Sequence, residues 1–173
     1  MSVEQLTRAL RDVPDFPKPG ILFKDITPIL GDPDLFGQAV DLLAERHRGE
    51  RIDKVAAVES RGFIFGVGVA RLLNAGFVPI RKAGKLPYET IELSYELEYG
   101  EATLAMHTDA VLADERVLIV DDLLATGGTA AAATGLVEQL GGIVVGLEFL
   151  IELDFLQGRS ALPGYDVCSH IHC

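Results

Sequence analysis

Two adjacent carboxylates, Asp121 and Asp122, follow a run of four aliphatic residues and precede the small residues 125–129. The aliphatic run predicts a buried strand, and the small residues predict a loop that opens a helix at about Thr129. Ionised carboxylates can only accept hydrogen bonds, so the paired hydroxyls of a vicinal diol are their natural partners. Backbone N–H groups at a helix N-terminus bind anions. A diol together with a phosphate describes a ribose 5-phosphate.

Two common phosphate-binding motifs are excluded at this segment. It is not a Walker A loop, because no lysine follows Gly127-Gly128, and the dinucleotide fingerprint G-x-G-x-x-G is absent. The alternative is a plain strand, turn and helix with two solvated aspartates.

The rest of the chain predicts the elements that position this segment. Strands are expected at 55–58, 77–81, 104–106, 117–120 and 143–150, and helices at 3–11, 33–48, 62–73 and 129–140. Strands that alternate with helices predict an α/β fold with a mostly parallel, doubly wound sheet flanked by helices. Ligands bind at the carboxyl ends of such strands. The chain is expected to form a single domain over residues 1–173.

One segment departs from this pattern. Residues 91–99 alternate strictly between apolar or aromatic side chains and polar ones, which is typical of a half-exposed ribbon. Glycines at 84 and 100 bracket the segment. We interpret residues 84–100 as a flexible flap that stands off the sheet and closes over a bound substrate.

Composition excludes several classes of protein. The net charge of −11 argues against non-specific binding to nucleic acid or anionic membranes. No apolar run is long enough to span a bilayer, and the N-terminus lacks a signal-peptide pattern. Cys168 and Cys173 form no disulfide framework, so a reducing cytoplasm is expected. The four histidines look scattered, without metal-ligand spacing.

A family resemblance covers most of the chain. Residues 117–129 resemble the phosphoribosyl-diphosphate (PRPP) motif of type I phosphoribosyltransferases. Segments 16–26, 59–63, 81–87 and 94–100 resemble adenine phosphoribosyltransferases, in the same order along the chain. The resemblance implies the type I phosphoribosyltransferase fold, with a small N-terminal hood, mainly residues 1–35. It also implies a homodimeric purine salvage enzyme that converts PRPP and adenine to AMP and pyrophosphate.

The resemblance implies roles for particular residues. It places the phosphate of PRPP or AMP at Ala125, Thr126, Gly127, Gly128 and Thr129, the ribose at Asp121 and Asp122, and pyrophosphate at Ser60, Arg61, Lys82 and Lys85. Arg61 and Lys82 are also expected to be catalytic, because departing pyrophosphate concentrates negative charge. The Glu59–Ser60 peptide is expected to be cis.

The same resemblance implies how the base is bound. The C=O of Leu22 and the N–H of Lys24 would meet the edge of adenine. Phe23 would stack on the purine with Leu123 on its opposite face. The alternative for Phe23 is a place in the core.

Glu98 is the expected general acid/base, facing the purine N7 when the flap closes. Spacing alone cannot select it among Glu92, Glu96, Glu98 and Glu101, and only the match of 97–100 does. Tyr99 is expected to be a flap contact.

Mg²⁺ is the expected cofactor, held mainly by PRPP oxygens and water, so no residue is assigned as a metal ligand. Two alternatives to adenine transfer stay open. A 6-oxopurine phosphoribosyltransferase would typically carry an acid at the position of Ala125. A PRPP-sensing regulator on the same fold would need a basic face or an added domain for binding DNA.

Overall fold

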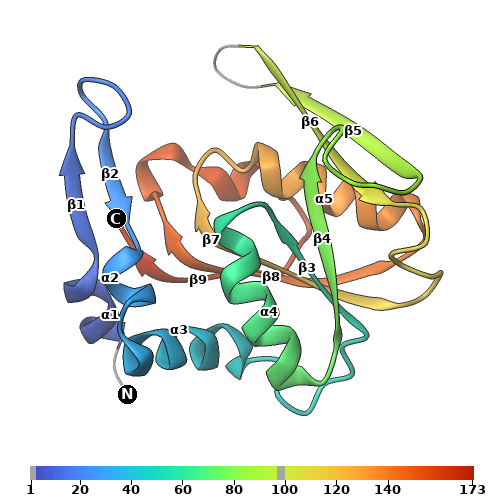
Figure 1. Ribbon diagram of the computed structural model, residues 1–173, viewed down its shortest axis with the longest axis horizontal. Coiled ribbons are helices and arrows are strands. Elements are labelled where there is room, and N and C mark those ends of the chain that lie inside the picture. Colours follow the sequence, from blue (N-terminus) through green and yellow to red (C-terminus); the bar gives the residue numbers. More distant parts are fainter. Residues whose placement is uncertain (1–2, 97–99) are drawn as a thin grey trace.

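A seven-stranded sheet forms the centre of the computed structural model, which describes residues 3–96 and 100–173 (Figure 1). The strand order is β5-β6-β4-β3-β7-β8-β9. The strands are β3 (Lys54–Val58), β4 (Gly76–Lys82), β5 (Thr90–Glu96), β6 (Glu101–His107), β7 (Arg116–Leu124), β8 (Ile143–Glu152) and β9 (Val167–His172). Strands β4, β3, β7, β8 and β9 are parallel, and β6 and β5 add an antiparallel edge. The prediction of a mostly parallel sheet is confirmed.

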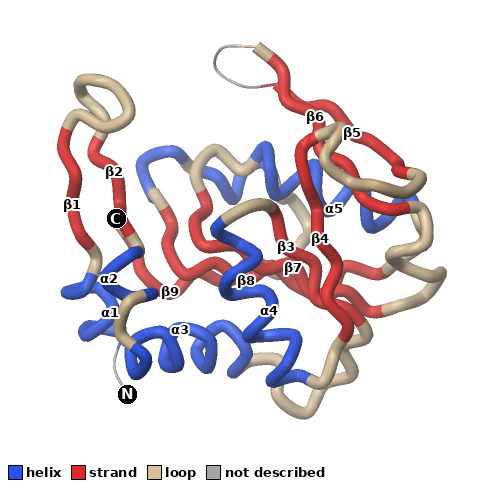
Figure 2. Tube along the Cα trace, viewed as in Figure 1, coloured by secondary structure: helices blue, strands red, loops and turns tan. Residues whose placement is uncertain are grey.

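Helices cover both faces of this sheet (Figure 2). The helices α1 (Val3–Ala9), α2 (Thr27–Leu30), α3 (Pro33–Glu45) and α4 (Arg61–Leu73) pack on one face, and α5 (Gly128–Gln139) packs on the other. Strand β7 serves both cores, because successive side chains of a strand point to opposite faces. Leu118 and Val120 join the core beneath α4, while Val117 and Ile119 join the core beneath α5. Within the described residues no helix is both long and apolar enough to cross a membrane.

Local sequence signals set the ends of several helices. Asp32 caps α3 by accepting hydrogen bonds from the N–H groups of Asp34 and Leu35, and Pro33 occupies the first turn. Asn74 ends α4 in the left-handed conformation, with φ of 54°. The first helix is shorter than predicted. It ends at Ala9 because residues 11–14 form a strand that the sequence analysis missed.

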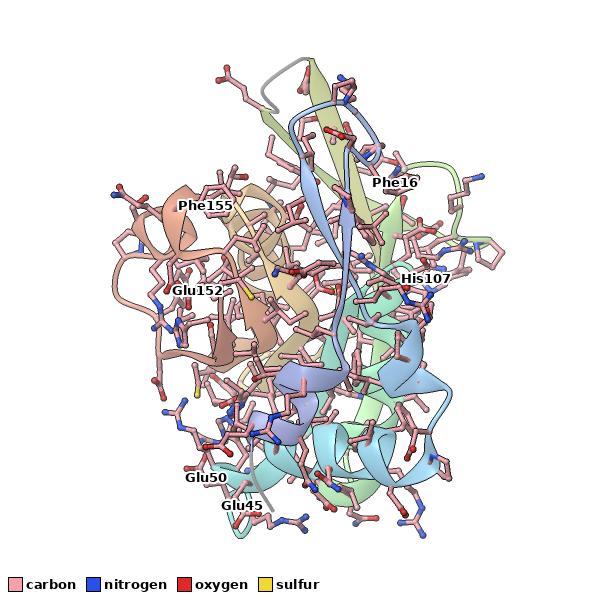
Figure 3. All side chains as sticks on the ribbon, turned by 90° about the vertical axis from the view of Figure 1, so that its left-hand side faces the viewer. Phe16, Glu45, Glu50, His107, Glu152 and Phe155 are labelled. Atoms are coloured by element: carbon pink, nitrogen blue, oxygen red, sulfur yellow. The ribbon has the colours of Figure 1, made fainter. Side chains whose placement is uncertain are left out.

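That strand, β1 (Arg11–Pro14), pairs with β2 (Leu22–Asp25) in a separate antiparallel hairpin. Its turn contains a cis Phe16–Pro17 peptide and Gly20, whose N–H donates to Asp15 Oδ1 at 2.7 Å. Phe16 is exposed at the turn (Figure 3). In Figure 1 this hairpin and the β5–β6 hairpin rise at the same end of the molecule.

The ribbon over residues 91–96 differs from its prediction in one respect. Its alternation is confirmed, since Glu92, Ser94 and Glu96 are exposed while Leu93 and Tyr95 are partly buried. It does not stand off the sheet, however. Strand β5 is the edge strand of the main sheet, and its apolar side chains pack on the core that contains α5. Burial of that apolar face holds the ribbon against the fold.

Candidate functional site

A cavity of about 720 Å³ opens at the carboxyl ends of β3, β4 and β7. This is where a ligand is expected in a doubly wound sheet. The predicted site residues that line it are Phe23, Ser60, Arg61, Lys82, Lys85, Asp121, Asp122, Leu123, Ala125, Thr126, Gly127 and Thr129. Leu22, Lys24 and Gly128 are not among the lining residues, and each is a neighbour in sequence of one that is. The structure thus brings together groups from three strand ends and the hairpin.

The two aspartates lie within β7, which continues to Leu124 instead of ending at Val120 as predicted. Asp122 is only 4% exposed, and its Oδ2 receives no hydrogen bond from the described residues. The N–H of Asp122 donates to Asp121 Oδ1 at 2.9 Å. Burial raises the pKa of both carboxyls, and the charge of Asp122 raises that of Asp121 further. The pair would therefore gain from a cation or from hydroxyl donors.

The loop after β7 has a backbone that only glycine accommodates. Gly127 has a φ of +86° and precedes α5, which begins at Gly128, one residue earlier than predicted. A Cβ on Gly127 would collide with the carbonyl oxygen of Gly158, and one on Gly158 would collide with that of Ala125. Gly127 has no side chain to cap the helix, so the first N–H groups of α5 remain available to an anion.

Tyr95 of β5 contacts this loop, an interaction that the sequence analysis missed. Its hydroxyl lies 2.9 Å from Thr129 Oγ1, and a Cβ on Gly128 would lie 3.1 Å from its ring. The period-two pattern placed Tyr95 on the apolar face, but nothing in the sequence indicated which helix that face would meet. Tyr95 joins the β5–β6 hairpin to the start of α5.

The loop between β3 and α4 carries Ser60 and Arg61. The Glu59–Ser60 peptide is cis, as predicted. Arg61 Nε lies 3.0 Å from Asp122 Oδ2, which makes an ion pair without hydrogen-bond geometry. Its guanidinium carbon lies 5.2 Å from the centre of the Phe23 ring. Arg61 therefore stands between the aspartate pair and the hairpin.

Glu59 and Arg81 position the lysines, and the sequence analysis assigned no role to either residue. Glu59 accepts the N–H of Lys82 at 2.7 Å and an N–H of Arg81 at 3.2 Å. Arg81 also donates to the C=O of Lys85 at 3.1 Å. Burial opposes ionisation of Glu59, but these donors outweigh it and lower its pKa. The loop 82–85 is thereby tied to the end of β3.

Three of the residues predicted to bind the base, Leu22, Phe23 and Lys24, lie on β2, and the fourth, Leu123, lies on β7. Phe23 faces the cavity instead of joining either core cluster, and Phe16 packs edge-on against it at 5.2 Å between ring centres. The Lys24 ammonium is 2.6 Å from Asp12 Oδ1 across the hairpin. Glu98 and Tyr99 lie outside the described residues, so their positions stay predictions.

Comparisons with known proteins point in one direction. The phosphoribosyl transferase domain family matches residues 29–161. An adenine phosphoribosyltransferase from Maridesulfovibrio salexigens is 58% identical over 162 residues, covering 94% of this chain and 95% of the relative. A crystal structure of adenine phosphoribosyltransferase from Thermoanaerobacter pseudethanolicus is 53% identical with a TM-score of 0.96, covering 99% of this chain and 100% of that one.

A third similar protein has been solved with ligands bound. It is adenine phosphoribosyltransferase from Saccharomyces cerevisiae, complexed with D-2,5-dideoxy-2,5-imino-altritol 1,6-bisphosphate and adenine. It is 45% identical with a TM-score of 0.92, and the alignment covers 98% of each chain.

Proposed function

The chain belongs to the adenine phosphoribosyltransferase family, and from this premise we propose how its residues act. The enzyme transfers the 5-phosphoribosyl group of PRPP to adenine in purine salvage, giving AMP and pyrophosphate. The observation that carries the assignment of residues is that two aspartates, a glycine loop and three cations line one cavity. The aspartates and the loop suit ribose 5-phosphate, and the cations suit pyrophosphate.

Asp121 and Asp122 are proposed to accept hydrogen bonds from the two ribose hydroxyls. Support comes from Asp122 Oδ2, which is buried and lacks a hydrogen-bond donor among the described residues. Such an oxygen is stabilised when a ligand supplies the donor. The 5-phosphate is proposed to bind the N–H groups of residues 125–129, with the hydroxyls of Thr126 and Thr129.

Arg61, Lys82 and Lys85 are proposed to bind pyrophosphate together with Ser60. Arg61 now faces Asp122 at 3.0 Å, so PRPP must share or replace that contact. A planar guanidinium can turn from a carboxylate to a phosphate without changing its charge. The lysines meet the charge that grows on the departing pyrophosphate, and Glu59 and Arg81 hold their loop.

Adenine is proposed to lie between Phe23 and Leu123, with its edge on the backbone of β2. The residue opposite Leu22 in the hairpin is Pro14, which has no N–H. In an antiparallel ladder a C=O either bonds the residue opposite or points outward. The C=O of Leu22 therefore takes no hydrogen bond from Pro14 and is free for the amino group of a base. If backbone groups bind the base, the side chain at position 24 need not contact it, and the Lys24 ammonium is paired with Asp12 instead.

Bond formation between adenine N9 and ribose C1′ accompanies cleavage of the bond from C1′ to pyrophosphate, which leaves with the electron pair. Glu98 is proposed to take the proton from N7, which raises electron density at N9. The strands that flank Glu98 are fixed near the cavity by the contact of Tyr95 with Thr129. Segment 84–100 is proposed as the flap that excludes water, within one domain whose residues 1–35 form the hood.

Mg²⁺ is proposed as the cofactor, and the residues present fit it. Two carboxylates with raised pKa and a buried oxygen without a donor suit a hard cation nearby. When bound with PRPP, the ion neutralises pyrophosphate charge. The chain's own part is to orient the ribose and to supply Arg61, Lys82 and Lys85.

We further propose a homodimer in the cytoplasm. The outer face of α4 exposes Ile64, Val67 and Leu72, at 40, 53 and 43%. An apolar stripe of this kind on one helix suits contact with a second copy of the chain.

Product detection tests the proposed function. The protein is incubated with PRPP, Mg²⁺ and adenine, hypoxanthine or guanine in turn. We expect AMP and pyrophosphate from adenine and little product from the other bases. Preferential formation of IMP would favour the 6-oxopurine alternative, whereas salt-sensitive DNA binding without turnover would favour the regulator. In Glu98→Ala we expect a kcat lower by about 100- to 10,000-fold with little change in PRPP affinity.

A further inference from the structure

A second cluster of titratable side chains lies on β8 and β9, outside the cavity. Both cysteines and two of the four histidines of the chain fall within residues 168–173. Strand β9 pairs in parallel with β8, which sets Cys168 opposite Glu148. His170 is two residues farther on and shares the face of Cys168. The expectation that the histidines are scattered is therefore wrong for this part of the fold.

Three ligand-type atoms converge at this point. His170 Nε2 lies 2.9 Å from Glu148 Oε2 and 3.9 Å from Cys168 Sγ. The ligand atoms of all three residues lie within 4.8 Å of one another. Tetrahedral zinc with ordinary bond lengths would separate two nitrogen or oxygen ligands by about 3.3 Å, and nitrogen from sulfur by about 3.6 Å. The distances from His170 Nε2 to Glu148 Oε2 and to Cys168 Sγ differ from these values by only a few tenths of an ångström.

The other oxygen of Glu148 contacts residues outside this group of three. Oε1 lies 3.1 Å from His47 Nε2 and 3.2 Å from an Arg46 nitrogen. Gly146 makes room for His47, since a Cβ there would lie 3.2 Å from the imidazole Cε1. Outer contacts of this kind fix the orientation of a metal-binding carboxylate. The charge of Arg46 is offset by Asp166, whose Oδ2 is 2.6 Å from its guanidinium.

We propose that Glu148, Cys168 and His170 form a zinc site, with water completing the coordination. A thiol, an imidazole and a carboxylate are the donors that zinc uses, whereas Mg²⁺ prefers oxygen alone. The short contact between His170 and Glu148 requires a proton between the two atoms, and the metal ion replaces that proton. The thiol of Cys168 loses its proton as well, so binding one Zn²⁺ releases protons to solvent.

Cobalt titration tests this site on the full chain, reduced and stripped of metal. Co²⁺ bound to a thiolate gives a charge-transfer band in the near ultraviolet and visible bands of tetrahedral coordination. We expect these bands to saturate at about one ion per chain and to disappear when Zn²⁺ is added, but not with equal Mg²⁺. In Cys168→Ser the near-ultraviolet band should be lost, and in His170→Asn the Co²⁺ affinity should fall at least about tenfold.

Two matched controls sharpen the result. Cys173→Ser removes the other cysteine and should keep the bands. His172→Asn disrupts a second group, Glu152, Asp154 and His172, which has no thiol and should contribute no charge-transfer band. Transferase activity should be unchanged in Cys168→Ser, because Cys168 lies outside the cavity, and that activity also reports folding. Absence of the band in the wild-type protein, or its persistence in Cys168→Ser, would overturn the proposal.

Discussion

Two buried carboxylates on neighbouring strands have opposite surroundings. Asp122 on β7 and Glu148 on β8 are 4% and 0% exposed, and Val120, two residues before Asp122, pairs with Glu148. Asp122 Oδ2 has no hydrogen-bond donor among the described residues. Glu148 contacts His47, His170 and Arg46 at 2.9 to 3.2 Å. The fold therefore leaves one oxygen of Asp122 without a hydrogen-bond donor among the described residues, whereas it gives both oxygens of Glu148 a partner.

The pKa directions follow from this difference. Burial raises the pKa of Asp122, and the partly exposed Arg61 does not compensate fully. Burial also disfavours the ionised Glu148, but its two histidines outweigh that effect and lower its pKa. A buried carboxylate oxygen without a donor at a strand end therefore indicates a site for a ligand in the cavity, while the contacts of Glu148 stabilise its ionised form within the fold.

Removing the charge of Glu148 should give the largest effect on stability. Glu148→Gln keeps the size of the side chain but removes the nearer carboxylate partner of the buried His47, which keeps Glu50 at 3.4 Å, and one of the two carboxylate partners of Arg46. We expect the free energy of unfolding to fall by about 3–5 kcal/mol. Urea denaturation in the absence of added metal measures it, with kcat/KM of the folded fraction as the control. A loss below about 1 kcal/mol would contradict the claim that the contacts of Glu148 stabilise the fold.

Asp122→Asn should have the reverse profile. Loss of the carboxylate should lower kcat/KM for PRPP by about 100- to 1000-fold, which corresponds to about 3–4 kcal/mol. The free energy of unfolding should stay equal or rise, because an ionised buried carboxylate is lost. Steady-state kinetics and urea denaturation together check this. A variant that is active but unstable would show that Asp122 serves the fold.

The ligand-binding segment should also depend on its backbone. Gly127→Ala places a Cβ at a positive φ and against Gly158, whereas Gly164→Ala meets the same kind of φ, +82°, in open space. We expect Gly127→Ala to weaken transition-state binding of PRPP by about 1–3 kcal/mol, read from kcat/KM. Gly164→Ala is the matched control and should leave kcat/KM unchanged. If both variants lowered kcat/KM equally, the close approach of Gly127 to Gly158 would have no role in PRPP binding.

The pH dependence of stability should separate the two carboxylates. The lowered pKa of Glu148 means that its contribution is present above about pH 4.3 and is lost as pH falls through its folded value. The raised pKa of His47, chiefly from Glu148, means that its contribution is present below about pH 6.5 and is lost as pH rises through the folded value.

The raised pKa values of Asp121 and Asp122 act in the opposite sense to that of Glu148, so their protonated forms favour folding at low pH. Each proton contributes a slope of about 1.4 kcal/mol per pH unit. In urea denaturation from pH 3.5 to 8, the free energy of unfolding of Glu148→Gln should fall less steeply toward low pH than that of the wild-type protein. The same slope at low pH in both proteins would contradict the assignment of this pH dependence to Glu148.

Local patterns in the sequence predicted much of the fold. Asp32-Pro33 marked the start of α3, and alternating strands and helices indicated a parallel sheet. Local patterns failed where pairing across the chain decides the structure. Strand β1 pairs with β2, and β9 pairs with β8, where Cys168 and His172 lie opposite Glu148 and Glu152.

The candidate site divides in the same way. The cavity residues on one continuous segment, 121–129, were predictable because the chemistry and the turn are adjacent. Tyr95, Glu59 and Arg81 were missed because their contacts join segments about 20 to 35 residues apart, which no spacing rule reveals. The cluster around Glu148 was missed for the same reason, since His47 lies 101 positions away from it.

The most direct test asks whether Asp121 and Asp122 bind the ribose hydroxyls. Calorimetry compares AMP with 2′,3′-dideoxy-AMP in the wild-type protein and in a variant carrying Asp121→Asn and Asp122→Asn, which forms a thermodynamic cycle. The wild-type protein should bind AMP at least about tenfold more tightly than the dideoxy ligand, a difference of about 1.4 kcal/mol. The variant should bind the two ligands almost equally. The same preference for AMP in both proteins would contradict the assignment of the aspartate pair to the ribose.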